Sequence, residues 1–274
     1  MSAATRDEQI GAATAYEALF VPALFGPWAP RVADAARIQP ADRVLDVACG
    51  TGVLTREAAS RLRSRGRVAG LDANPGMIAV ARQLAPDIEW SEGTAESLPF
   101  PDASFDVVVS QFGLMFFSDR RQALREMLRV LTPGGRLGMA VWDAVERMPA
   151  YAAEVALLDR TAGGRAAAAL GAPFVLGNPQ DLTALCVEAG IASPAVTTLR
   201  GSAEFPSIRV MVEADLRGWL PVMGVVLTED QIAGILREAE QALGPYATPD
   251  GRASFDVSAH LVTASKPRQE ERDR

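Results

Sequence analysis

The chain has 274 residues, of which 49% are hydrophobic, and it carries a formal net charge of −7 with a sequence pI of about 4.9. This composition excludes a disordered chain and predicts one enzyme-sized α/β domain, while the acidic balance argues against nucleic acid and anionic membranes as partners. Neither an apolar run of about 18 residues nor a secretory signal pattern is found, so we expect a cytoplasmic monomer or homodimer without a membrane partner. The cysteines, Cys49 and Cys186, fit no metal-binding pattern, and no metal is expected.

The first half of the chain predicts strands and helices in alternation. The expected strands lie at 43–50, 66–74, 87–93, 104–113 and 135–142. The expected helices lie at 53–62 and 74–85, and a third begins after the cap residue Asp119 and keeps its apolar periodicity as far as Leu131. Apolar strands separated by helices predict a doubly wound parallel sheet that is covered on both faces.

The second half of the chain does not continue this alternation of strands and helices. It predicts Ala-rich helices at 145–176, an amphipathic helix at 178–190, a sixth strand at 193–201, a helical insertion at 207–244 and a long last strand at 252–266. The charged tail that follows is expected to be frayed.

A glycine turn, residues 50–52, separates the first strand from the first helix of the core. Such a turn lets the backbone approach a nucleotide, and the helix that follows offers free N–H groups. Dinucleotide-binding turns carry a third glycine where this chain has Thr55. Asp72 lies 20 positions beyond Gly52, the spacing at which a carboxylate accepts hydrogen bonds from a ribose.

Five motifs in this order, "VLDVACGTG", "GLDAN", "GTAESLPF", "FDVVVSQFG" and "LRVLTPGGRLGMAVW", resemble the class I S-adenosylmethionine-dependent methyltransferases. The sequence is most similar to the small-molecule branch that includes the ubiquinone/menaquinone-biosynthesis type, over residues 40–142. The resemblance implies a Rossmann-like, seven-stranded sheet with an antiparallel last strand, plus helical lid segments. It implies methyl transfer from S-adenosylmethionine to a small, partly apolar acceptor, mainly by proximity and alignment.

The resemblance also divides the chain. We expect N-terminal lid helices at 1–40, a methyltransferase core at 41–206, a helical lid insertion at 207–244, the final core strand at 245–265 and a flexible tail at 266–274.

The resemblance places cofactor-binding residues at the ends of the first four strands. They are Asp46, Ala48, Gly50, Thr51, Gly52, Asp72, Ala73, Met77, Thr94, Ala95, Ser110 and Gln111. Asp46 would repel a pyrophosphate but suits a ligand with an ammonium and a sulfonium; alternatively, it orients the loop. Thr94 departs from the aspartate usual in the family, so adenine is expected to rest on the Ala95 backbone and on Met77.

No catalytic base can be named, because the only histidine, His260, is expected to be structural in the middle of the last strand. The resemblance places Phe112 beside the transferred methyl group. With Met115, Tyr16 and Trp219 it is a candidate for the acceptor wall, with ordinary core packing as the alternative. Two other functions stay open: a nicotinamide-dependent oxidoreductase, and a cofactor-binding protein of the same fold without turnover.

Overall fold

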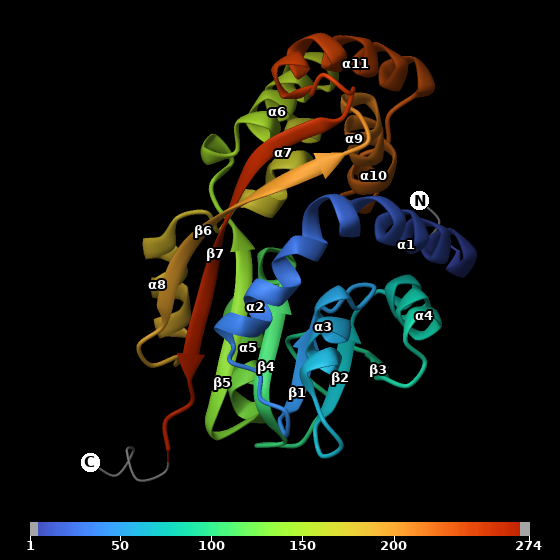
Figure 1. Ribbon diagram of the computed structural model, residues 1–274. Helices are drawn as coiled ribbons and strands as arrows, with labels where there is room; N and C mark the ends of the chain where they lie inside the picture. Colours follow the sequence, from blue (N-terminus) through green and yellow to red (C-terminus); the bar gives the residue numbers. More distant parts are fainter. Residues whose placement is uncertain (1–4, 269–274) are drawn as a thin grey trace.

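A seven-stranded sheet forms the core of the computed structural model, which describes residues 5–268 (Figure 1). Its strands are β1 (Arg43–Val47), β2 (Arg67–Asp72), β3 (Glu89–Glu92), β4 (Phe105–Gln111), β5 (Leu131–Trp142), β6 (Ala195–Phe205) and β7 (Ala253–Ser265). The strand order is β3-β2-β1-β4-β5-β7-β6, and β1 to β5 pair in parallel. β7 lies antiparallel between β5 and β6, which confirms the predicted fold class. Most of the predicted tail, 269–274, lies outside the described residues.

Helices cover the sheet and build a cap at one of its edges. The longer ones are α1 (Arg6–Phe20), α2 (Ala29–Ala35), α3 (Val53–Arg61), α4 (Pro75–Leu84), α5 (Arg120–Val130), α6 (Pro149–Ala162), α7 (Gly164–Gly171), α8 (Pro179–Glu188), α9 (Ile208–Ala214) and α11 (Glu229–Ala242). Short helical turns are η1 (Val21–Phe25), η2 (Gly26–Trp28), η3 (Leu114–Phe116), η4 (Val145–Arg147), η5 (Ala172–Phe174), η6 (Asp215–Trp219), α10 (Leu220–Val222) and η7 (Gly244–Tyr246). None of the helices in residues 5–268 has both the length and the apolar character that a membrane crossing needs.

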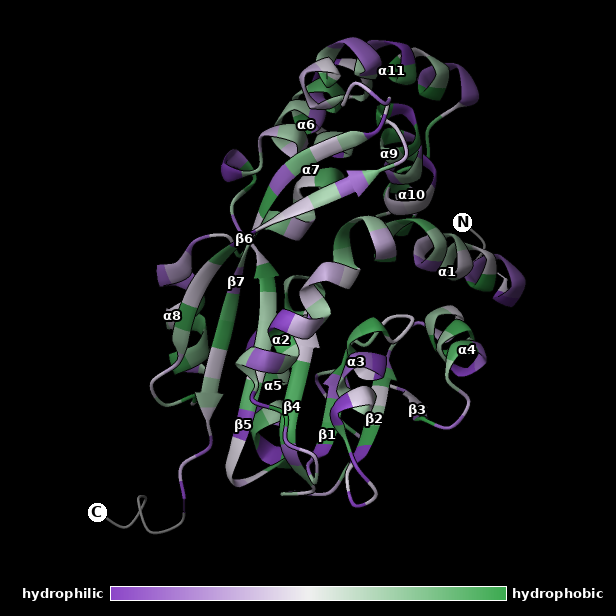
Figure 2. Ribbon diagram, viewed as in Figure 1, coloured by the Kyte–Doolittle hydropathy of each residue, from purple (hydrophilic) through white to green (hydrophobic). Residues whose placement is uncertain are grey.

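Side-chain alternation along β5 assigns the two faces of the sheet. Gly138 faces α2, and a Cβ at this position would lie 2.6 Å from the Cβ of Ala36. Trp142, four residues on, points to the same side and packs edge-on against Trp28. α2 packs with α3, whereas α5 packs with α8. The central strands are dominated by hydrophobic residues, as expected for strands buried on both faces (Figure 2).

The carboxyl ends of the parallel strands meet at one edge of the sheet, and the cap stands above that edge (Figure 1). α6, α7, α9, α10 and α11 form the cap, and α1 runs between the cap and the core. The chain thus places its N-terminal segment over the edge to which the predicted cofactor residues belong.

One predicted boundary is wrong. The apolar periodicity extends the helix after Asp119 to Leu131, but α5 ends at Val130 and Leu131 begins β5. Leu131 pairs with Phe105, and the register shifts before Val107 pairs with Arg136. The segment "TPGG" therefore lies within the strand as an irregularity, because backbone pairing with β4 outweighs a helical pattern of side chains.

The contact between Gly70 and Trp90 gives a test of the fold. A Cβ on Gly70 would lie 2.4 Å from the buried Trp90 ring, so Gly70→Ala should lower the free energy of unfolding by about 1–3 kcal/mol through overpacking. Gly11 in α1 has no atom within 4 Å of an added Cβ, so Gly11→Ala should be neutral or stabilise by up to about 1 kcal/mol. Urea unfolding of both variants measures the difference; equal stabilities would contradict the packing described.

Candidate functional site

Asp46, at the carboxyl end of β1, is a buried carboxylate with one bound oxygen and one open oxygen. The Thr55 hydroxyl donates to Oδ2 over 2.6 Å, whereas Oδ1 is buried without a partner among the described residues. Burial raises the pKa of Asp46 to about 7. Thr55, which occupies the position of the third glycine, thus holds the Asp46 side chain in place. The unpartnered Oδ1 of Asp46 is available to a cation.

The turn after Asp46 needs left-handed backbone. Ala48, Gly50 and Gly52 have φ values of 58°, 56° and 90°. A Cβ on Gly52 would lie 2.3 Å from the Trp90 ring, so only glycine fits where α3 begins. The tight turn leaves the Gly50 N–H pointing toward the end of β2.

Asp72 joins the ends of β1 and β2. Its Oδ2 accepts from the Gly50 N–H and its Oδ1 from the Asn74 N–H, each over 2.8 Å. Burial raises the pKa of Asp72, while these two N–H groups act in the opposite direction. An ionised carboxylate offers about four acceptor positions, so Asp72 can accept further hydrogen bonds.

The remaining predicted cofactor residues follow the same edge. The backbone of Gly93 donates to the Asp72 carbonyl, and this contact brings the loop of Thr94 and Ala95 beside the end of β2. Ala73, Met77 and Thr94 are exposed or half-buried at this edge, whereas Ala95 is buried. Thr51 is also buried, within the glycine turn.

The end of β4 approaches the β1 loop closely at Gly113. A Cβ on Gly113 would lie 2.6 Å from the Cβ of Ala48 and 3.0 Å from the Ser110 hydroxyl. The Ser110 Oγ is buried without a partner among the described residues. The neighbouring Gln111 donates from its Nε2 to the Phe25 carbonyl over 3.0 Å, and its Oε1 is buried without a partner among the described residues.

Aromatic rings fill the edge beside β4 and β5. Phe112 has a φ of 56° and stacks on Trp142 with ring centroids 3.7 Å apart. Phe25 lies against both rings and also stacks on Tyr16, at 5.2 Å. The predicted wall residues Phe112 and Tyr16 therefore belong to one cluster. The cluster also contains Trp28 and Trp142, which the sequence analysis did not predict as wall residues, because an apolar tryptophan in a sequence usually indicates core packing.

Tyr16 lies directly over the glycine turn. A Cβ on Gly50 would be 4.0 Å from the Tyr16 hydroxyl. Burial and the nearby carboxylates, Asp72 first among them, raise the pKa of this phenol well above its ordinary range. The N-terminal segment thus contributes a polar atom to the region between Asp46 and Asp72.

Glu17 fastens α1 to the glycine turn. Its Oε2 accepts from the Thr51 hydroxyl, and its Oε1 forms an ion pair with Arg56 over 2.7 Å. Arg56 also donates to the Thr51 carbonyl over 2.6 Å. Sequence reasoning missed Glu17 and Arg56, because nothing in a run of helical residues indicates a partner 34 or 39 positions away.

The two other acceptor candidates are packed beneath or within the cap. Met115, in η3, is buried, and the neighbouring Phe116 lies 5.1 Å from the Trp219 ring. The Trp219 Nε1–H donates to the Ala169 carbonyl over 2.9 Å. The pair Phe116–Trp219 therefore joins the loop after β4 to the cap.

His260 is held in the sheet and faces away from the aromatic cluster. Its ring nitrogens lie 2.9 Å from the Thr198 hydroxyl and 3.0 Å from the Gly177 carbonyl, and Nε2 is 3.3 Å from Asp143. His260 pairs with Val141, whose side chain points opposite to that of Trp142. These contacts support a structural role.

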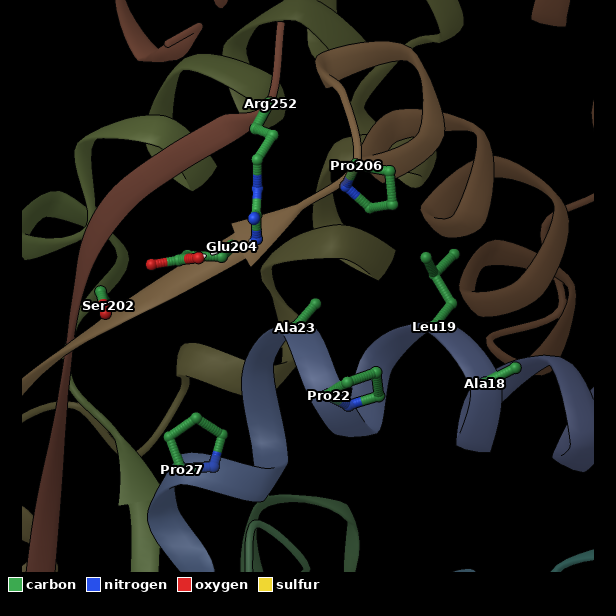
Figure 3. A pocket seen from close by; sticks show the side chains of 9 residues that line it. All are labelled: Ala18, Leu19, Pro22, Ala23, Pro27, Ser202, Glu204, Pro206 and Arg252. Carbon is green, nitrogen blue, oxygen red and sulfur yellow. Dashed lines mark hydrogen bonds and ion pairs between the residues drawn. The ribbon is translucent and has the colours of Figure 1, made fainter. Parts of the chain in front are cut away.

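A separate hollow of about 650 Å³ lies between the N-terminal segment and the end of β6 (Figure 3). Ala18 and Pro22 line it from one side, and the ion pair Arg252–Glu204 lies on the other. Residues two apart on a helix point in nearly opposite directions, so Ala18 faces away from the side of Tyr16. The N-terminal segment therefore separates this hollow from the edge that contains Asp46.

Residues 45–139 match the family model described as "Methyltransferase domain". This segment is therefore similar to a methyltransferase domain. Over 116 residues it is 43% identical to the ubiquinone/menaquinone biosynthesis C-methyltransferase UbiE of Ectopseudomonas mendocina, a match that covers 40% of this chain and 45% of that protein. The chain thus spans about half the length of the curated relatives it matches.

Solved structures support the same fold. The YcgJ protein of Bacillus subtilis has a TM-score of 0.58 at 22% identity, over 88% of this chain and 98% of its own. Phosphoethanolamine N-methyltransferase 2 of Haemonchus contortus, solved with phosphomonomethylethanolamine and S-adenosylhomocysteine, has a TM-score of 0.58 at 16% identity, over 97% of this chain and 61% of its own. The chain accordingly has the Rossmann-like architecture that the sequence predicts.

The Glu17 contacts predict that α1 is held down by a small number of polar bonds. Glu17→Gln should raise amide hydrogen exchange in α1 by about five- to thirtyfold, because the charge of these part-exposed, solvent-screened bonds contributes about 1–2 kcal/mol to local closure. Glu57→Gln is a matched control, since Glu57 pairs with Arg61 within α3. Unchanged exchange of α1 in Glu17→Gln, or the same change in both variants, would contradict this role.

Proposed function

We propose that this chain binds S-adenosylmethionine at the carboxyl edge of β1, β2 and β4 and catalyses methyl transfer to a small, partly apolar organic acceptor. The observation that carries the proposal is the convergence of Asp46, Gly50 and Asp72 within the segment that is similar to a methyltransferase domain. Incubation with methyl-labelled S-adenosylmethionine and a panel of quinols, phenols and amines should label at least one acceptor. A panel without label would favour the alternative of a binding protein without turnover.

The residues at this edge fit the cofactor. Oδ1 of Asp46 and Oγ of Ser110 are buried polar atoms that have no partner among the described residues. Such atoms often mark a ligand position. Asp72 retains acceptor capacity for ribose hydroxyls. The glycine turn provides the close backbone approach that the amino acid part of the cofactor needs.

The bound cofactor would supply an electrophilic methyl group on a sulfonium. Asp46 would attract the positive end of the ligand, and Asp72 would fix the ribose. Tyr16, above Gly50, would close the site from the cap side and exclude water, which strengthens the electrostatic attraction of Asp46. Holding donor and acceptor in line accounts for most of the expected acceleration, so no general base is assigned.

The acceptor would arrive between the end of β4 and the cap. Phe112 and Met115 would lie below it, with Trp219 and Tyr16 on the lid side. The quinone-biosynthesis name of the relative from Ectopseudomonas mendocina supports an acceptor with an apolar ring. We propose that residues 1–40 and 207–244 act as the lid.

A nicotinamide-dependent oxidoreductase is less well supported. Thr55 replaces the third glycine of a dinucleotide turn and uses its hydroxyl to hold Asp46. A pyrophosphate placed at this turn would meet the buried Asp46 carboxylate, which repels it once ionised.

Replacing Asp72 tests the ribose contact. Asp72→Ala should weaken binding of S-adenosylhomocysteine by about one to two orders of magnitude, since a charge-assisted hydrogen bond contributes about 1.5–3 kcal/mol. Asp87→Ala is the control, because Asp87 is exposed before β3. Isothermal titration calorimetry measures both, and unchanged affinity in Asp72→Ala would remove Asp72 from the site.

Asp46 predicts a pH dependence of cofactor binding. A cationic ligand favours the ionised acid, so binding lowers the pKa of Asp46 from about 7 and affinity rises with pH up to that value. Since only about a tenth of the acid is ionised one unit below its pKa, affinity for S-adenosylmethionine should rise about five- to tenfold from about pH 6 to about pH 7.5. Asp46→Asn should bind weakly without this slope; a flat wild-type profile would contradict the assignment.

A further inference from the structure

Two buried carboxyl groups in the cap have no place in the proposed methyl transfer. Glu154 lies on α6 with 0% exposure, and Asp215 begins η6 with 4% exposure. Glu154 Oε1, Glu154 Oε2 and Asp215 Oδ2 are buried without a hydrogen-bond partner among the described residues. A buried polar group without a partner costs about 1–3 kcal/mol, so three open oxygens at one place indicate a missing partner.

The two acids are neighbours that do not bond to each other. Burial raises the pKa of both, and the charge of Asp215 raises that of Glu154 further. The charges of both acids also raise the pKa of Tyr151, one helical turn before Glu154. The three groups are close enough to interact electrostatically, yet none of the three open oxygens has a hydrogen-bond partner among the described residues.

Arginines of the cap form ion pairs with other acids rather than with Glu154 and Asp215. Arg217, two residues beyond Asp215, pairs with Glu213 and Glu229 at the surface. Arg160 on α6 pairs with Glu238. Within the described residues, burial and Asp215 are the causes that shift the pKa of Glu154, and no positive group offsets them.

The elements that carry the pair are connected to the loop after β4. Tyr151 packs against Phe174 of η5, with ring centroids 5.3 Å apart, and η5 contacts η3 directly after β4. On the other element, Trp219 of η6 lies 5.1 Å from Phe116 of η3, and η6 also contacts α1. The loop after β4 is therefore contacted directly by η6, which carries Asp215, whereas α6, which carries Glu154, is connected to that loop through Phe174 of η5.

The backbone at Asp215 is also unusual. Residues Asp215–Trp219 form a π-helical turn between α9 and α10. Such turns are rare and frequently occur at functional sites, because the extra residue changes where the side chains point. Here the turn begins at the residue whose carboxylate is buried without a cation.

We propose that Glu154 and Asp215 bind a protonated amine carried by the methyl acceptor. An ammonium has three donors for the three open oxygens, whereas a hydroxyl has one, and its single positive charge balances one ionised acid of the pair while the other acid keeps its proton. Tyr151, which is close enough to both acids for their charges to raise its pKa, packs against the rings of Phe174 and Phe255, and aromatic faces attract cations. A protonated amine is no nucleophile, so it anchors the acceptor while another atom receives the methyl group.

This inference rests on the proposed function, and its test separates the two. Hexylamine and hexan-1-ol have chains of equal length and serve as probes, titrated calorimetrically into the full chain with S-adenosylhomocysteine present. We expect the amine to bind at least about tenfold more tightly than the alcohol. Glu154→Gln and Asp215→Asn should each remove most of this preference, whereas Glu238→Gln, at an exposed acid of α11, should retain it.

The outcomes are distinct. Equal affinities of amine and alcohol, no binding of either, or an amine preference that persists in both variants would overturn the inference and leave a buried water as the partner of the acids. Binding of S-adenosylhomocysteine reports on the proposed function independently, because Glu154 and Asp215 lie outside the cofactor residues. If S-adenosylhomocysteine does not bind, the proposed function fails, and the amine titration without it still tests the acid pair.

Discussion

The hydrogen bond from the Gly50 N–H to the Asp72 carboxylate is the contact on which the site depends. It joins the loop after β1 to the end of β2 over 2.8 Å, and it requires the left-handed turn at Ala48, Gly50 and Gly52. The same turn is held from below by Trp90 and from above by Tyr16 and Glu17. A carboxylate that organises a loop while keeping free acceptor positions can bind a ligand without losing its own structure.

Buried acidic side chains occur at two places in the molecule. Asp46 at the edge of the sheet and the pair Glu154 and Asp215 in the cap have open oxygens and raised pKa values. Desolvation without an internal cation costs stability, and it is tolerated where a ligand brings the opposite charge. We therefore propose that each position binds a cation. Asp46 would meet the positive charge of the methyl donor, and Glu154 and Asp215 would meet that of the acceptor.

The sequence predicts the core well because its signals are local. Alternating apolar runs, the cap residue Asp119 and the spacing of Asp72 from the glycine turn can all be recognised without knowledge of distant contacts. The contacts that complete the site are not local. Glu17 finds Thr51 and Arg56 only after the chain folds back, and Glu154 sits in an Ala-rich helix whose pattern gives no sign of a second acid across the cap.

Binding of S-adenosylmethionine or of NAD distinguishes a methyltransferase site from a dinucleotide site. Equilibrium binding of S-adenosylmethionine and of NAD to the full chain can be compared by calorimetry under identical conditions. We expect micromolar or tighter binding of S-adenosylmethionine, about −8 kcal/mol in binding free energy, and no measurable binding of NAD. Binding of NAD in that range without binding of S-adenosylmethionine would contradict this expectation.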